Sequence, residues 1–275
     1  MKIYLFNRYR NTRYSALKFI FCLLAFCAAQ QSAAQSLVVN HEAKLSKTVT
    51  LTAIDNFTLS GQLNVGLATS GGVLLLHDCQ HIAKDFQPLH SALVKQGLFV
   101  LSLDLRGFGA SQNEDYSHKS IRLKADDIVS YQGKLAALML HWESDVLSAY
   151  QYLQRTMNNN QSISIVTSGC SSNQAIYLAQ KTALKSVVML SPELSVDDKE
   201  QFKHLPDMPI YLLSAKYLTE AMLNAQELFD WSGDRHSVLQ TFKGNGSSYY
   251  LLKQQTYLNE NIAIWLNSTL STLPE

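Results

Sequence analysis

The chain has 275 residues, of which 47% are apolar and 16% are charged, so it can bury a sizeable core. This length suits one large α/β domain, and no internal period indicates repeats. The formal net charge is +1. The first 34 residues hold five of the 23 basic residues and no acidic ones, which leaves 18 basic against 22 acidic residues and a charge of −4 for the remainder. This charge does not favour nucleic acid or an anionic membrane as a partner.

The first 34 residues have the pattern of an export signal. A basic region precedes the apolar run "FIFCLLAFCAA", and the small residues of "QSAAQ" offer a cleavage site between Ala34 and Gln35. The apolar run is shorter than the roughly 20 residues that span a bilayer. Lipidation at Cys27 is a further alternative, which the bulky Phe26 disfavours. We predict a signal peptide over 1–34, a periplasmic or secreted protein, and no stable membrane anchor after cleavage.

The next segment predicts a β-hairpin. The runs 48–55 and 57–66 are rich in β-branched residues and flank a turn at Asp55-Asn56. Short apolar runs then alternate with helical patterns, which favours a mainly parallel sheet covered on both faces. The expected strands are 71–78, 98–104, 162–168, 186–191, 208–215 and 237–242. The expected helices are 84–97, 135–155, 172–183, 219–231 and 249–270, the second ending at the asparagines 158–160.

Sites in such sheets lie beyond the carboxyl ends of the strands. The loops to inspect therefore follow "LLLHD", "LSLD", "IVTS", "VVMLS", "YLLSA" and "QTFKG". The apolar stretch "LAALMLHW" could belong to the core or form an exposed apolar lip beside these loops.

In order along residues 48–270, the chain resembles the α/β-hydrolase family. The resemblance is carried by "GGVLLLHDCQH", "VLSLDLRGFGAS", "IVTSGCSSNQAIYLA", "MPIYLLSAKYLTEA" and "QTFKGNGSSYYLL". It implies an α/β-hydrolase fold over 35–275 as a single domain, with about eight strands, mostly parallel, and helices on both faces. Residues 192–208 are too few for a helical cap, so no large cap domain is expected.

The family's nucleophile elbow falls on "SGCSSNQA", where the resemblance makes Ser171 the nucleophile. Gly169, two residues earlier, fits the elbow pattern. Asn173 stands where the family has a second glycine, so the turn departs from the pattern. The alternative is a purely structural role, in which Ser171 or Ser172 is the N-cap residue of the following helix.

The resemblance assigns the oxyanion hole to the backbone N–H groups of Cys79 and Ser172. The family usually has His-Gly at the start of the first loop, whereas this chain has His77-Asp78. A carboxylate beside a developing oxyanion would oppose it, unless Asp78 turns away. We expect Asp78 to turn to solvent or to a backbone turn, so this departure weakens the case for the oxyanion hole without excluding it.

The other two triad positions hold residues that cannot do the family's chemistry. Ser247 stands in the histidine position and Tyr217, next to Lys216, in the acid position. A serine hydroxyl has far too high a pKa to act as the base. Glu193 and Glu220 are nearby carboxylates, which are idle without a histidine to orient. The chain beyond the signal has histidines at 41, 77, 81, 90, 118, 141, 204 and 236, and His81 alone lies on a loop at the expected edge.

The resemblance also places Cys79 and Cys170 at facing loops, where two states are open. They form a disulfide in an oxidising compartment, or they are two small buried residues. Cys170 is disfavoured as a nucleophile because it lies one residue before the nucleophile position of the elbow. We predict no metal site and no cofactor, because no ligand spacing is present and "RGFG" (106–109) matches no nucleotide fingerprint.

Two functions follow from these residues. The first is an exported pseudoenzyme that keeps the fold to bind a small acyl or ester ligand or a protein partner. The alternative is a serine hydrolase of small esters that uses Ser171 with an unidentified base. The missing histidine favours the first function.

Overall fold

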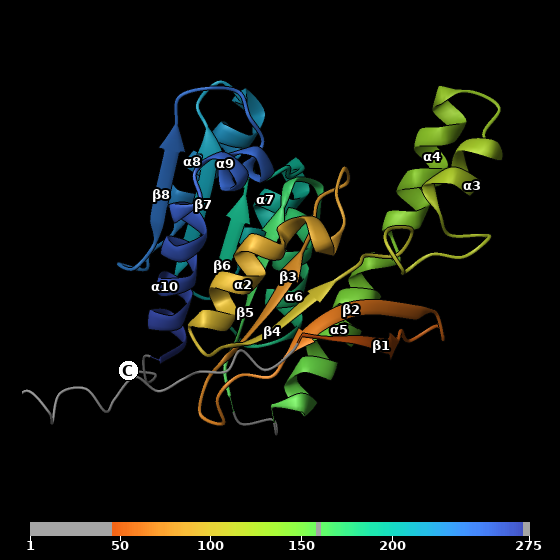
Figure 1. The fold of residues 1–275 in the computed structure, drawn as a ribbon. Helices are drawn as coiled ribbons and strands as arrows, with labels where there is room; N and C mark the ends of the chain where they lie inside the picture. Colours follow the sequence, from red (N-terminus) through yellow and green to blue (C-terminus); the bar gives the residue numbers. More distant parts are fainter. Residues whose placement is uncertain (1–45, 158–160, 272–275) are drawn as a thin grey trace, which may run out of the picture. The chain divides into compact units, whose positions relative to one another are not determined.

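The computed structural model describes residues 46–157 and 161–271, which contain an eight-stranded sheet (Figure 1). The strands are β1 Lys47–Thr52, β2 Thr58–Asn64, β3 Gly72–Leu76, β4 Phe99–Leu103, β5 Ile163–Ser168, β6 Leu184–Leu190, β7 Ile210–Ala215 and β8 Val238–Phe242. Their order is β1-β2-β4-β3-β5-β6-β7-β8. Strands β1, β2 and β4 pair antiparallel, and every other pair is parallel. The predicted α/β-hydrolase fold is confirmed, and the predicted signal peptide lies outside the described residues.

Helices cover both faces of this sheet, because the parallel strands are apolar on both sides. The helices are η1 Ala83–Phe86, α2 Gln87–Lys95, α3 His118–Leu123, α4 Ile128–Met139, α5 Trp142–Thr156, η2 Gly169–Ser171, α6 Ser172–Lys181, α7 Val196–Phe202, α8 Thr219–Trp231, α9 Ser248–Gln254 and α10 Tyr257–Ser271. One core cluster packs α2, α9 and α10 against the sheet, and the other packs α5, α6, α7 and α8. No described helix is long and apolar enough to cross a bilayer.

The helix predicted over 135–155 is in fact two helices, α4 and α5, separated at Leu140 and His141. Trp142 begins α5, is completely buried, and donates its indole N–H to the carbonyl of Arg106 at 3.1 Å. This tertiary anchor fixes where α5 starts, which helical periodicity cannot indicate. The closing helix is also divided, between α9 and α10, where the Asn259 amide donates to the carbonyls of Leu252 and Thr256.

Helices α3 and α4 are side by side and largely exposed (Figure 1). In α4 only Leu138 is buried, whereas Ile128, Val129 and the following Leu140 are exposed. The stretch "LAALMLHW" is therefore core at Leu138 and Trp142 and exposed at Leu140.

Candidate functional site

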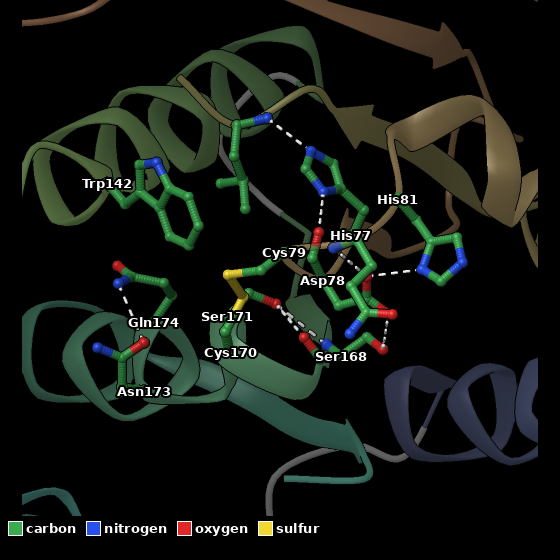
Figure 2. The surroundings of a disulfide bond; sticks show 12 residues. His77, Asp78, Cys79, His81, Trp142, Ser168, Cys170, Ser171, Asn173 and Gln174 are labelled. Atoms are coloured by element: carbon green, nitrogen blue, oxygen red, sulfur yellow. Dashed lines mark hydrogen bonds and ion pairs between the residues drawn. A yellow bond between two sulfur atoms is a disulfide. The ribbon is translucent and has the colours of Figure 1, made fainter. Parts of the chain in front are cut away.

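The hydroxyl of Ser171 makes its hydrogen bonds within the turn after β5 (Figure 2). Its Oγ donates to the carbonyl of Ser168 at 3.0 Å and accepts the Ser168 N–H at 3.0 Å. The side chain is completely buried, and the backbone of Ser171 has φ −87° and ψ 2°, so its φ is negative. The residue with a left-handed backbone is Gly169, which follows β5 directly and has φ +52°. The hydroxyl of Ser171 is thus engaged inside its own turn.

Two acidic side chains lie over Gly169. A Cβ atom built on Gly169 would lie 3.2 Å from Cβ of Asp78 and 3.3 Å from Oε1 of Glu193. Glu193 follows β6, and its N–H donates to the Gly169 carbonyl at 3.3 Å. Burial, followed by the charges of Asp78 and Glu220, raises the pKa of the Glu193 carboxyl. The space above Gly169 is therefore narrow and acidic.

Cys79 and Cys170 are joined by a disulfide, with their Cα atoms 5.9 Å apart. The bond links the loop after β3 to the turn after β5, as Figure 2 shows. Both residues are half-buried and pack against the core on the α5 and α6 face. Of the two states that the sequence left open, the structure has the bonded one.

The loop after β3 is also pinned by His77. Its Nδ1–H donates to the carbonyl of Asp78 at 2.7 Å, and its Nε2 accepts the backbone N–H of Leu105 at 3.0 Å. The Leu105 donor fixes this tautomer, since Nε2 must then carry the lone pair. Burial lowers the pKa of the His77 imidazole. His77 is therefore a neutral bridge between the loops after β3 and β4.

His81, in the same loop, contacts the side-chain carboxylate of Asp78. Its Nδ1 lies 2.6 Å from Oδ1 of Asp78, which also accepts the N–H of Gln80. The imidazole stacks on Tyr249 of α9 with ring centroids 3.8 Å apart. Among the described residues, Nε2 of His81 has no hydrogen-bond partner. The sequence had marked His81 as the one histidine at this edge, and its Nδ1 is held in place.

The loops after β7 and β8 carry no such side-chain links at the triad positions. Tyr217 is 58% exposed, and its backbone N–H donates to the carbonyl of Gly244 at 2.8 Å. Ser247 is the N-cap residue of α9 but makes no side-chain capping bond. Ser172, the other predicted oxyanion donor, gives its N–H to the Gly169 carbonyl. This amide is thus already engaged at the start of α6.

Arg106, in the glycine-punctuated turn after β4, is a structural residue that the sequence reasoning missed. Its buried guanidinium donates to Asp145 at 2.6 and 2.9 Å and to Asp55 at 2.6 and 2.8 Å. It also lies over the ring of Phe57, 4.2 Å from the centroid. The hydrogen bond from Arg106 lowers the pKa of Asp55 to about 2. This network ties the β1–β2 turn to the loop after β4 and to α5.

No group of three or more His, Cys, Asp or Glu among residues 46–157 and 161–271 has a geometry that could hold a metal ion.

No protein-family model and no curated protein matches this chain. Solved structures do match. An esterase of Pyrococcus furiosus, Pf2001, is 16% identical with a TM-score of 0.61, covering 82% of this chain and 92% of that one. The esterase domain of a Rhodothermus marinus protein is 14% identical with a TM-score of 0.60, covering 82% and 99%. A dienelactone hydrolase from Anabaena variabilis is 14% identical with a TM-score of 0.59, covering 82% and 98%. The chain therefore has the α/β-hydrolase fold, with neighbours that include esterases.

Proposed function

We propose that this chain is an exported α/β-hydrolase-fold protein that has lost covalent catalysis by a serine triad and binds a small ligand instead. The proposal rests on the backbone conformation of Gly169, which has a positive φ. In a nucleophile elbow, the nucleophile sits on a sharp, strained turn between strand and helix. Here the residue that follows β5 with positive φ is Gly169, which has no side chain to react.

This register moves the elbow two residues before Ser171. The sequence pattern Gly169-Cys170-Ser171 matches the usual spacing of glycine and nucleophile, which is why Ser171 was the expected nucleophile. Its buried hydroxyl and its two hydrogen bonds to Ser168 support a turn-stabilising role. A serine hydroxyl that attacks a substrate has to break such hydrogen bonds and reach the substrate carbonyl.

The base and acid positions support the same conclusion. Ser247 and Tyr217 replace the histidine and the carboxylate that would activate a nucleophile. In a serine protease, loss of the nucleophile or base alone removes about 10⁶-fold in rate. What remains after such a loss is binding and the oxyanion hole.

The shifted register also reassigns the oxyanion donors. The amide after position 169 belongs to Cys170, and the amide of the β3 loop belongs to Cys79. The disulfide between these two residues holds both segments together. We infer that the pair can still present N–H donors to the carbonyl of a small acyl or ester ligand.

Export is supported by the basic and apolar pattern of residues 1–34 and by the disulfide. Disulfides persist mainly in oxidising compartments outside the cytosol. We therefore propose that the protein acts in the periplasm or outside the cell.

The test is labelling with a fluorophosphonate, which reacts with activated serines, together with turnover of p-nitrophenyl acetate. The wild type and Ser171→Ala are compared, with an active serine esterase as positive control. We expect both proteins to give the same negligible labelling. Labelling and turnover in the wild type that vanish in Ser171→Ala would instead establish a serine hydrolase.

A further inference from the structure

A small cavity of about 120 Å³ lies between α2 and the C-terminal helices α9 and α10. It is lined by Asp85, Phe86, Pro88, Leu89, Tyr249, Leu252, Lys253 and Asn259. A cavity of about 150 Å³ walled by apolar side chains accepts benzene. The cavity between α2 and α10 is thus the size of a single small ring or a short chain.

The walls of this cavity are mainly apolar and well supported. Phe86, Leu89 and Leu252 are buried, with Phe86 only 2% exposed. Tyr249 closes one side with its ring, which also packs edge-on against Phe86 at 5.8 Å between centroids. Apolar walls with a few polar groups are typical of sites for small molecules.

One lining residue, Asn259, carries a buried polar atom that lacks a partner among the described residues. Asn259 is 4% exposed, and its Nδ2 donates to the carbonyls of Leu252 at 3.0 Å and Thr256 at 3.2 Å. These two bonds fix the orientation of the amide. Its Oδ1 is buried and has no hydrogen-bond partner among the described residues. An unpaired buried acceptor is costly, so a ligand that donates a hydrogen bond here would be favoured.

The two charged residues of the lining favour a neutral ligand. Asp85 accepts the backbone N–H of Ile82 at 2.9 Å, and Nζ of Lys253 lies 5.8 Å from the centroid of the Tyr249 ring. Both side chains are thus engaged with this chain's own groups. Because their charges are opposite, the lining has no net charge to offset that of an ion.

The cavity also adjoins the loop that carries the imidazole–carboxylate pair. Phe86 and Tyr249 line the cavity, and both rings contact the ring of His81. A ligand in the cavity would therefore press on the residues that position His81 against Asp78. This places it beside the edge of the sheet where sites of this fold lie.

We propose that this cavity binds a small neutral molecule, with an apolar ring or short chain and one O–H or N–H group that donates to Oδ1 of Asn259. The inference goes beyond the ligand-binding role proposed above, because neither Cys79 nor Cys170 lines this cavity and its ligand donates a hydrogen bond instead of accepting one. Phenol and toluene are matched probes, because they differ by a hydroxyl donor in place of a methyl group.

The experiment titrates each probe into the ¹⁵N-labelled protein and follows backbone amide shifts. We expect shifts at Phe86, Tyr249 and Leu252, and phenol binding about tenfold more tightly than toluene, as one added hydrogen bond would give. Pro88→Trp, at the exposed rim, should abolish binding of both probes. Leu223→Trp, on the exposed face of α8, is the matched control and should leave binding unchanged.

A second variant separates the hydrogen bond from the shape of the cavity. Asn259→Leu should reduce phenol binding to the level of toluene while toluene binding stays within about threefold. If this variant fails to fold, the comparison of the two probes in the wild type still decides the question. Equal affinities in the wild type, absence of binding, or binding that survives Pro88→Trp would each overturn the proposal. None of these results depends on fluorophosphonate labelling, so a failure here leaves the loss of serine catalysis standing.

Discussion

The loops after β3, β4 and β5 differ sharply from the loops after β7 and β8. The first group is cross-linked by the Cys79–Cys170 disulfide and by the His77 bridge to Leu105, and Arg106 ties the loop after β4 to Asp55 and to Asp145 of α5. At the triad positions of the second group, Tyr217 is exposed and Ser247 makes no side-chain capping bond. The loops after β3 and β5 are thus held by side-chain links, while Tyr217 and Ser247, at the positions that the resemblance assigns to the acid and the base, have none of these links.

This difference teaches that framework and chemistry are separable in this fold. The residues that hold loops in place act through burial and hydrogen bonds, which are needed whether or not a reaction occurs. Residues that only activate a nucleophile stabilise nothing, so their replacement has little effect on folding. Mutations that compare the two regions test this separation directly.

The largest expected effect comes from opening the disulfide. It closes a sequence separation of 91 residues, for which chain entropy predicts a stabilisation of about 4 to 5 kcal/mol. The double variant Cys79→Ala/Cys170→Ala should lose this much free energy of unfolding in urea titrations. Wild-type protein unfolded under reducing conditions is the control and should lose a similar amount. A loss below about 1 kcal/mol would contradict a framework role for the bond.

A smaller effect is expected from acid, through His90. This buried imidazole of α2 contacts Ser102 of β4 and Asn64 of β2, each at 2.6 Å. Burial lowers the pKa of His90 to about 4, against 6.5 for a free imidazole. Below pH 6.5 the unfolded chain binds the proton more readily, so stability is lost as the pH falls from about 6.5 to about 4.

Between pH 7 and pH 5, protonation of His90 alone should lower the free energy of unfolding by about 2 kcal/mol. We expect the free energy of unfolding to fall over this range, and His90→Gln to show a shallower pH dependence. Equal slopes for the two proteins would mean that His90 is not held neutral in the fold. His236→Gln is the matched control, since His236 is an exposed histidine that contacts Asp234.

The smallest effects are expected at Tyr217 and Ser247, the positions that the resemblance assigns to the acid and the base. Tyr217→Ala and Ser247→Ala should each change the free energy of unfolding by no more than about 0.5 kcal/mol, because Tyr217 is exposed and substitutions away from buried or capping contacts usually have effects of this size. For Ser247 the reason is specific, because its hydroxyl makes no capping bond to α9. Urea titration checks both. A loss above about 2 kcal/mol at either position would erase the contrast between the two groups of loops.

Much of the fold was predictable from the sequence because buried parallel strands read as short apolar runs. The runs at 71–78 and 162–168 predicted β3 and β5, and the proximity of Cys79 and Cys170 followed from the strand order that the resemblance implied. The position of the turn was harder. Gly169 has positive φ while Ser171 does not, and no pattern of residue types distinguishes that register from the usual one.

The other features that could not be predicted from the sequence depend on contacts between residues far apart along the chain. Arg106 pairs with Asp55 and Asp145, which are 51 and 39 residues away along the chain. The helical periodicity of the sequence continues through Leu140 and gives no sign of a break. The contact of Trp142 with the carbonyl of Arg106 separates α4 from α5, and it joins residues far apart along the chain. The cavity beside Asn259 likewise depends on how α2 meets α10, which only packing decides.

The glycine after β5 also has an evolutionary consequence. A side chain held in a left-handed backbone conformation costs on the order of 1 to 3 kcal/mol, which an enzyme tolerates because the strained turn exposes its nucleophile. Gly169 adopts φ +52° without that cost. Under the proposed loss of catalysis, replacing a nucleophile by glycine at this position would remove the chemistry and relieve the backbone strain in one substitution. A lineage released from selection for catalysis would therefore tend to keep the glycine, and regaining the nucleophile would require stability from elsewhere in the fold.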